Sequence, residues 1–363
     1  MMKFLLFLII TSVTILPQDS KIEILSNSHL IYSYQNVKIQ TDEKSFEVVS
    51  GTSSVYSEQI KGKKVIYNSE NGSYLLITNY GFKPAKDDYN IDYFLFDESF
   101  KLITKYSEIA PFDLPHPIAS VSDNGFIVLF DPLSYELKII DEKGKTEISL
   151  QKEVPLEMER TAFIRCYANT IIVGVNEIAM NNSVTEAEID LFSIDKTTNK
   201  VSASKLNLSI LTGLYIDENR MFVSGVVWDN SSVKGKSFIY ETSSEKLIQI
   251  TDFNFDNIVK TDNGYLTSNG NQIRNISSEG IILNETKINS FRIYSLVKHD
   301  GNIFLTYSAE SGNYLLILNE ENLKPETAPY FISNKQISNK LTISKNNELY
   351  FQDINSTFIY RMK

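Results

Sequence analysis

Two kinds of turn alternate along this chain, and their regular spacing constrains the fold more than any other feature of the sequence. In the first kind an apolar residue precedes an acidic or polar one, at Phe96-Asp97, Ile140-Asp141, Ile194-Asp195, Tyr240-Glu241, Ile276-Ser277 and Leu318-Asn319. The second kind lies roughly 20 residues earlier, at Asn71-Gly72, Asn124-Gly125, Ala168-Asn169, Glu218-Asn219, Asn263-Gly264 and Asp300-Gly301. A repeat of about forty residues is typical of propellers and other repeat architectures.

Each repeat is predicted to contain four strands. In the unit at 118–150 we expect strands at Ile118–Val121, Phe126–Phe130, Leu137–Ile140 and Glu147–Leu150. The inner strands are continuously apolar and the outer ones alternate, which indicates a sheet buried near one edge and solvated near the other. We interpret the Asn-Gly and Asp-Gly pairs as type I′ turns that join the first two strands, because such turns need positive φ at both central residues.

These features predict an all-β chain that forms a single β-propeller of four-stranded blades. A β-sandwich, or two of them, is the alternative. Beyond the six clear repeats, residues 29–60 supply one looser unit, and the C-terminus supplies three strands at Leu341–Ser344, Leu349–Gln352 and Phe358–Met362. Lys21–Leu25 is a strand with no local partner, so we expect it to complete the last blade and close the ring. Eight blades are preferred, and seven blades with an irregular N-terminal hairpin are the alternative.

The repeat resembles the secreted NHL-like and quinoprotein-like β-propellers. The resemblance rests on the stretch 123–128 (DNGFIV) with Ile139-Ile140-Asp141, and on equivalent stretches that begin at 217, 262 and 300. It spans nearly the whole chain after the N-terminal segment, but it is generic. It implies the fold, and no catalytic residue can be carried over from it.

The N-terminal segment has the pattern of a secretory signal. Lys3 precedes the apolar run Phe4–Leu16, which Pro17 ends; the run is too short for a membrane-spanning helix. We therefore expect residues 1–19 to be a signal peptide, or an uncleaved short anchor, and residues 20–363 to be the propeller domain. The expected location is periplasmic, cell-surface or extracellular. Cys166 is the only cysteine, so no intrachain disulfide can form, and we expect it to be a small buried core residue.

The charge balance argues against nucleic acid as a partner. The chain has 35 Lys and Arg against 45 Asp and Glu, a net charge of −10, whereas binding to phosphate backbones needs clustered cations. A monomer that binds an unknown protein, peptide or glycan is the expected state.

The predicted binding surface is the propeller face that carries the longest connections, because loops on a rigid scaffold commonly carry binding residues. These connections are 81–91, 107–117, 151–160, 176–187 and 229–236. The candidate binding residues on or beside them, or on a strand lining the channel, are Tyr80, Phe82, Asp87, Asp88, Asp113, His116, Arg160, Arg165, Trp228 and Asp229.

The reasons differ from residue to residue. His116 lies between Pro115 and Pro117 and could titrate near neutral pH; a structural or merely exposed histidine is the more common explanation of such a residue. Trp228 with Tyr80, Phe82 and Phe112 could form an aromatic platform for a sugar or peptide, or these could be ordinary strand-end core residues. Asp87 and Asp88 could bind a cation or form a solvated loop tip.

No catalytic residue, cofactor or metal site is predicted. The three histidines fall on different parts of the repeat, and no nucleophile or phosphate-loop motif is present. Asp252–Asn257 spaces its side chains somewhat like a calcium loop but lacks the central glycine and the final glutamate. We favour a non-catalytic binding protein. The alternative is a propeller-fold hydrolase or lyase with a site at the mouth of the central channel.

Overall fold

The computed structural model contains β-strands and no helix in the residues it describes. Those residues are 22–26, 30–34, 37–42, 45–50, 53–69, 73–83, 88–111, 117–150, 158–179, 189–229, 232–333, 341–343, 348–352 and 357–362. Within this part of the chain, no helix is long and apolar enough to cross a membrane.

Six consecutive four-stranded antiparallel sheets occupy most of the chain. The first contains β6 (Lys63–Asn68), β7 (Leu75–Lys83), β8 (Asp88–Phe96) and β9 (Leu102–Pro111). The second contains β10 (Ile118–Val121), β11 (Ile127–Asp131), β12 (Glu136–Asp141) and β13 (Gly144–Ser149). The third contains β14 (Met158–Tyr167), β15 (Thr170–Ala179), β16 (Ile189–Asp195) and β17 (Lys200–Leu206).

The other three sheets repeat the same order. They contain β18 (Ile210–Ile216), β19 (Arg220–Asp229), β20 (Ser232–Glu241) and β21 (Leu247–Thr251); then β22 (Asn257–Thr261), β23 (Gly264–Asn269), β24 (Gln272–Ile276) and β25 (Ile282–Lys287); then β26 (Arg292–His299), β27 (Asn302–Ala309), β28 (Gly312–Asn319) and β29 (Tyr330–Ser333). In each sheet the strands pair in sequence order, so each repeat forms one sheet.

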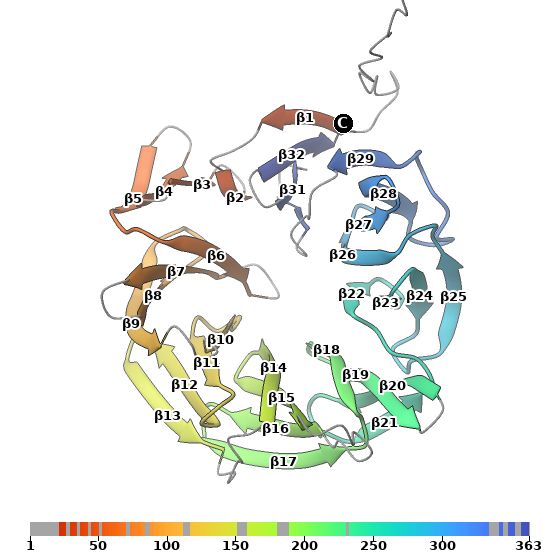
Figure 1. The fold of residues 1–363 in the computed structure, drawn as a ribbon, viewed down its shortest axis with the longest axis horizontal. Coiled ribbons are helices and arrows are strands. Elements are labelled where there is room, and N and C mark those ends of the chain that lie inside the picture. Colours follow the sequence, from red (N-terminus) through yellow and green to blue (C-terminus); the bar gives the residue numbers. More distant parts are fainter. Residues whose placement is uncertain are drawn as a thin grey trace, which may run out of the picture.

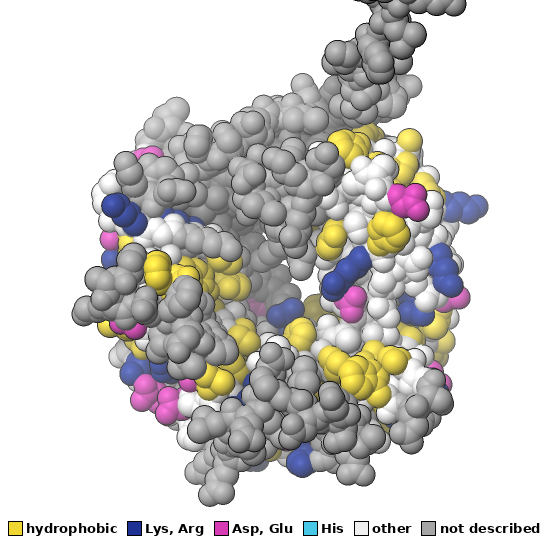
Figure 2. Space-filling view, in the orientation of Figure 1, with side chains coloured by type: hydrophobic (Ala, Val, Ile, Leu, Met, Phe, Trp, Pro, Cys, Tyr) yellow, Lys and Arg dark blue, Asp and Glu magenta, His cyan; other side chains and the backbone are white. Residues whose placement is uncertain are grey.

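The sheets stand around a central axis, with the first strand of each innermost (Figure 1). The space-filling view shows an opening at the centre of the ring (Figure 2). This arrangement is that of a β-propeller, and it confirms the predicted all-β fold with at least six four-stranded blades.

The strands near the two ends of the chain pair with one another. One sheet contains β2 (Leu30–Tyr34), β3 (Val37–Asp42), β4 (Ser45–Ser50) and β5 (Ser53–Glu58). In the other, β1 (Ile22–Ser26) pairs antiparallel with β32 (Thr357–Met362), which is followed by β31 (Glu348–Gln352) and β30 (Thr342–Ile343).

The core lies between neighbouring sheets. Between the sheets β10–β13 and β14–β17, Tyr135 is fully buried and makes edge-to-face contacts with Phe130, at 5.8 Å between ring centroids, and with Phe192, at 6.0 Å. Cys166 belongs to the same cluster and is 2% exposed, which confirms its prediction as a buried core residue. Each blade thus buries both faces of its inner strands against its two neighbours, which explains the apolar runs.

The predicted type I′ turns are mostly wrong. Of the three Asn-Gly and Asp-Gly pairs that the structure describes, only Asp300-Gly301 has positive φ at both residues, 46° and 70°. At Asn124-Gly125 and Asn263-Gly264 only the glycine is positive. There the glycine follows the two central residues of the turn, a position that also favours glycine. The pattern located the turns correctly and misassigned their type.

Candidate functional site

The topology divides the loops between two faces. The connections between second and third strands, and those between successive sheets, lie on one face, which we call the long-loop face. We call the opposite face the short-turn face. Every segment predicted to be a connection is partly occupied by a strand. The strands that extend into these segments are β7, β8, β9, β14, β15, β19 and β20. The long-loop face is therefore built largely from the ends of long hairpins.

Several candidate residues cannot be placed. Asp87, Phe112, Asp113 and His116 lie outside the described residues, and of Asp229 only the position at the end of β19 is described. The structure therefore leaves the proposed role of His116 as a prediction.

The hairpin of β7 and β8 carries an exposed aromatic pair near its end. Phe82 lies opposite Tyr89 in the register, with ring centroids 5.2 Å apart, and Phe82 is 44% exposed. Tyr80 is half-buried and lies one pair further into the sheet, opposite Ile91, while Asp88 lies at the end of the hairpin opposite Lys83. Three of the predicted site residues, Tyr80, Phe82 and Asp88, thus lie in one hairpin.

Buried polar groups hold this hairpin in place. The carboxylate of Asp92 accepts hydrogen bonds from Ser107 Oγ at 2.6 Å and from Asn90 Nδ2 at 2.9 Å, and Asp92 is 4% exposed. Asn79 Nδ2 donates to the carbonyl oxygen of Lys61 at 3.2 Å and lies 3.4 Å from Asp92. These bonds connect all three outer strands of the blade, so the exposed ring of Phe82 stands on a rigid base.

A second hairpin exposes apolar side chains in the same way. The segment 229–236, expected to be a long loop, is the tight end of the β19–β20 hairpin, because Asp229 pairs with Ser232. Trp228, 40% exposed, lies opposite Val233, 66% exposed. The backbone N–H of Trp228 donates to Ser209 Oγ at 2.9 Å, which anchors the strand to the preceding connection.

The sequence pattern does not single out two further aromatic residues of this face, Phe291 and Tyr314. Phe291 is 67% exposed in the connection between β25 and β26. Near the end of the β27–β28 hairpin, the half-buried Tyr314 stacks on Tyr307, a core residue that is only 6% exposed, with 5.5 Å between ring centroids. The only available signal was an aromatic residue beside a Gly- or Ser-containing turn, which also describes many core positions in this chain. Hydrophobic side chains gather over β18–β20 and over β6–β8 in the space-filling view (Figure 2).

The two arginine candidates lie elsewhere. Arg160 is 6% exposed; its guanidinium lies 5.9 Å from the Tyr135 ring and donates to the Leu133 carbonyl oxygen at 3.5 Å. Arg165 is half-buried on β14 and donates to the Ile164 carbonyl oxygen at 2.8 Å. Arg160 therefore joins two blades, and the structure does not bring either arginine into the exposed aromatic set.

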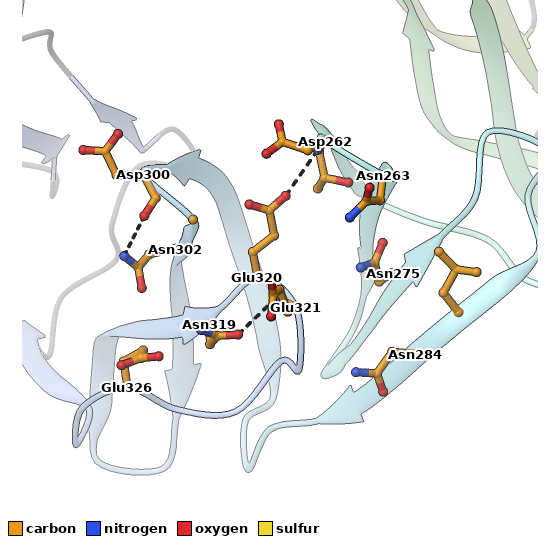
Figure 3. A pocket seen from close by; sticks show the side chains of 13 residues that line it. Asp262, Asn263, Asn275, Asn284, Asp300, Asn302, Asn319, Glu320, Glu321 and Glu326 are labelled. Carbon is orange, nitrogen blue, oxygen red and sulfur yellow. Dashed lines mark hydrogen bonds between the residues drawn. The ribbon is translucent and has the colours of Figure 1, made fainter.

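A cleft of about 840 Å³ lies on the opposite, short-turn face, between the sheets β22–β25 and β26–β29. Thirteen residues line it (Figure 3): Thr261, Asp262, Asn263, Asn275, Leu283, Asn284, Asp300, Gly301, Asn302, Asn319, Glu320, Glu321 and Glu326. Eleven of these are Asp, Glu, Asn or Thr. No residue in it was a predicted site residue, because the two turns involved belong to different repeats.

One lysine supports the wall of this cleft. Lys298 Nζ lies 2.6 Å from Asp262 Oδ1 and 3.0 Å from Glu320 Oε1. Partial burial by itself would lower the pKa of Lys298, but the two carboxylates raise it above its usual value. Among the described residues, no group of three or more His, Cys, Asp or Glu side chains has the geometry to hold a metal ion.

Comparisons with known proteins identify the fold. No model of a protein family matches the sequence, and no curated protein matches it either. The Dos1 propeller superposes with a TM-score of 0.58 over 94% of this chain and 96% of its own, at 12% identity. Puromycin hydrolase matches 80% of this chain and 50% of its own, with a TM-score of 0.50 and 10% identity. AztD from Citrobacter koseri is 11% identical, with a TM-score of 0.41 over 85% of this chain and 95% of its own. At these identities the likeness shows a β-propeller and no specific function.

Proposed function

We propose that this chain is an exported, non-catalytic β-propeller that binds a protein or peptide through the aromatic hairpin ends of its long-loop face. The observation that carries the proposal is the exposure of Phe82, Trp228, Val233 and Phe291, each at least 40% accessible, at or near that face. Exposed apolar side chains that gather in a contiguous patch commonly mark an interaction site, and aromatic residues dominate the energy of such contacts.

A protein or peptide fits this surface better than a glycan does. Sugars stack on flat aromatic rings and also need polar groups beside them, whereas Trp228 stands opposite the aliphatic Val233. An apolar side chain of a partner would remove both from water together.

The same proposal includes eight blades and export. Support for eight blades comes from the pairing of β1 with β32, which provides the C-terminal strands with a fourth partner, and from the four paired strands β2–β5. Support for export comes from the sequence of residues 1–19. We propose that residues 20–363 form the mature, monomeric domain, located in the periplasm, at the cell surface or outside the cell.

A binding experiment with matched variants tests the proposal. We expect Phe82→Ser and Trp228→Ser to reduce the recovery of partners from the native extracellular or periplasmic fraction by about tenfold, the effect of losing a central aromatic contact. Ile282→Ser is the control, because Ile282 is equally exposed, at 44%, but lies on the outer strand β25. All three proteins should keep the wild-type melting temperature within about 2 °C, because none of the side chains is in the core.

The result also separates the alternatives. Equal recovery by all variants would contradict the assignment of this face. If the variants recovered fewer glycans but as many proteins as the wild type, the partner would be a glycan. A hydrolase or lyase would instead turn over a substrate, and its activity would be insensitive to Phe82→Ser and Trp228→Ser if its site were at the channel mouth.

A further inference from the structure

We infer that the cleft between the sheets β22–β25 and β26–β29 is a second binding site, on the short-turn face, and that it takes a guanidinium group. It is independent of the proposed function, because it lies on the opposite face from the exposed aromatic residues.

The charge of the cleft selects a cation. Five carboxylates line it, from Asp262, Asp300, Glu320, Glu321 and Glu326, and no lysine or arginine does. Lys298 is not a lining residue; it pairs with two of the five carboxylates, so the charge of the set remains strongly negative. Asp262 and Asp300 are largely exposed at the rim, at 85% and 78% of their side-chain surface. A cation that approached this face would be attracted at the rim before it reached the interior.

Two buried oxygens without partners point to hydrogen-bond donors on that cation. Asn275 is 8% exposed and Thr261 is 6% exposed, and Asn275 Oδ1 and Thr261 Oγ1 make no hydrogen bond in the described part of the protein. Figure 3 shows Asn275 between Asn263 and Asn284, on the side of the cleft that faces Glu320 and Glu321. A buried acceptor without a partner is costly, and a ligand that donates to it would remove that cost.

The neighbouring polar groups are held in place by the turns. Asn319 Oδ1 accepts from the backbone N–H groups of Glu321, at 3.1 Å, and Asn322, at 3.2 Å. Glu320 is 8% exposed, and its Oε1 accepts from the backbone N–H of Asp262 at 3.3 Å. The walls from the two sheets are therefore linked across the cleft, so the acceptors are preorganised.

A guanidinium fits these groups better than the other cations do. It is a planar set of five N–H donors without an acceptor, suited to carboxylates and amide oxygens together. A metal ion is disfavoured because the carboxylates do not converge on one point. A sugar is disfavoured because the cleft holds no aromatic ring, and Leu283 is its one apolar side chain.

Calorimetric titration of the purified full-length protein with defined probes tests this inference. The probes are N-acetyl-arginine amide, a hexa-arginine peptide, and N-acetyl-citrulline amide, which has the same shape as the arginine compound but no charge. We expect the arginine probes to bind, the citrulline probe to bind at least about tenfold more weakly, and affinity to fall as salt is raised. If both arginine probes bind, a single guanidinium compound is a sufficient ligand for the cleft. If only the hexa-arginine peptide binds, the ligand is a basic peptide.

Variants locate the site. The double substitution Glu321→Gln and Glu326→Gln should weaken the arginine probes by about tenfold or more, and Asn275→Leu, which removes one orphan acceptor at nearly constant size, should also weaken them. Glu142→Gln is the control: Glu142 is an exposed glutamate at the corresponding turn, between β12 and β13, of another blade. If Asn275→Leu fails to fold, the affinity of the Glu321 and Glu326 double variant for the arginine probes still tests the inference.

Three results would overturn the inference. They are the absence of binding by either arginine probe at millimolar concentration, equal affinity for the citrulline probe, and equal affinity of the Glu321 and Glu326 variant. Calcium binding that competes with the probes would reassign the cleft to a metal ion. Because the Phe82 and Trp228 variants leave this cleft intact, failure here and failure of the proposed function are distinguishable.

Discussion

In five of the six repeated apolar-polar pairs, the polar residue caps the turn that follows it. Its side-chain oxygen accepts a hydrogen bond from the backbone N–H two residues later. The capping residues and donor–acceptor distances are Asp97 with Ser99 at 2.9 Å, Asp141 with Lys143 at 2.9 Å, Asp195 with Thr197 at 2.7 Å, Ser277 with Glu279 at 3.2 Å and Asn319 with Glu321 at 3.1 Å. The apolar member ends the third strand in the core. One dipeptide thus buries the end of a strand and satisfies the turn.

Asp141 makes this capping role testable, because it also lies 2.9 Å from Lys196 Nζ of the next blade. Burial alone would raise the pKa of Asp141, but Lys196 and the backbone N–H groups of Lys143 and Gly144 lower it below its usual value. The carboxylate therefore stabilises the fold above the unfolded-state pKa of about 4, and this contribution is lost as pH falls through the lower folded-state pKa.

We expect Asp141→Ala to lower the free energy of unfolding at pH 7 by about 1 kcal/mol, since it removes both the cap and the ion pair. Asp141→Asn keeps an acceptor for the cap and should cost about half as much. Urea unfolding at pH 7 and pH 3 measures this. An Asp141→Asn difference that persisted unchanged at pH 3 would contradict the pKa argument.

At the scale of the elements, side chains that cross from one blade to the next join the sheets. Asn176 on β15 is 3% exposed; its Oδ1 accepts from the backbone N–H of Leu211, at 2.7 Å, and its Nδ2 donates to Thr161 Oγ1 at 3.0 Å. Ser224 performs the same task one blade later, where its Oγ accepts from the backbone N–H of Phe255 at 2.6 Å. Adjacent blades are therefore connected by buried polar bonds as well as by apolar packing.

Replacing Asn176 tests the strength of this connection. Asn176→Ala leaves the buried N–H of Leu211 without its acceptor, so we expect the free energy of unfolding to fall by about 2 kcal/mol. The exposed Asn207 offers a control, and Asn207→Ala should change stability by less than about 0.5 kcal/mol. Equal effects of the two variants, measured by chemical unfolding, would show that the bond between the blades contributes nothing specific.

For the whole molecule, the two termini and the two faces have different tasks. The pairing of β1 with β32 brings the ends of the chain into one sheet (Figure 1). The hairpin ends of one face expose apolar side chains, while the tight turns of the other are capped and carry the acidic cleft. On the proposed function, substitutions that change stability and substitutions that change binding therefore fall on different faces.

Deletion of β1 tests the closure. A protein that lacks Ile22–Ser26 leaves β32 as an unpaired edge, so we expect its melting temperature to fall by about 5 °C or more and its tendency to aggregate to rise. The matched comparison is a protein that lacks only residues 1–19. Melting of both forms within one or two degrees would refute closure by β1 and favour seven blades with an irregular N-terminal hairpin.

The sequence by itself determined the blade and its position along the chain. Every strand predicted for 118–150 is present, with ends shifted by at most three residues, because alternation, apolar runs and turn residues act over a few neighbours. The turn type was misassigned, since the position of a glycine within a turn depends on the pairing register of the strands.

The sites were decided only by the tertiary structure. Whether Trp228 is a core residue or an exposed one depends on how far β19 extends beyond the neighbouring sheets, and Arg160 is buried because Tyr135 of another blade lies beside it. The acidic cleft combines residues from 261 to 326 that belong to two repeats. The packing between sheets determines which side chains are exposed and which residues from different repeats lie close together. A sequence pattern that recurs in every sheet does not show which of the equivalent residues are exposed next to one another.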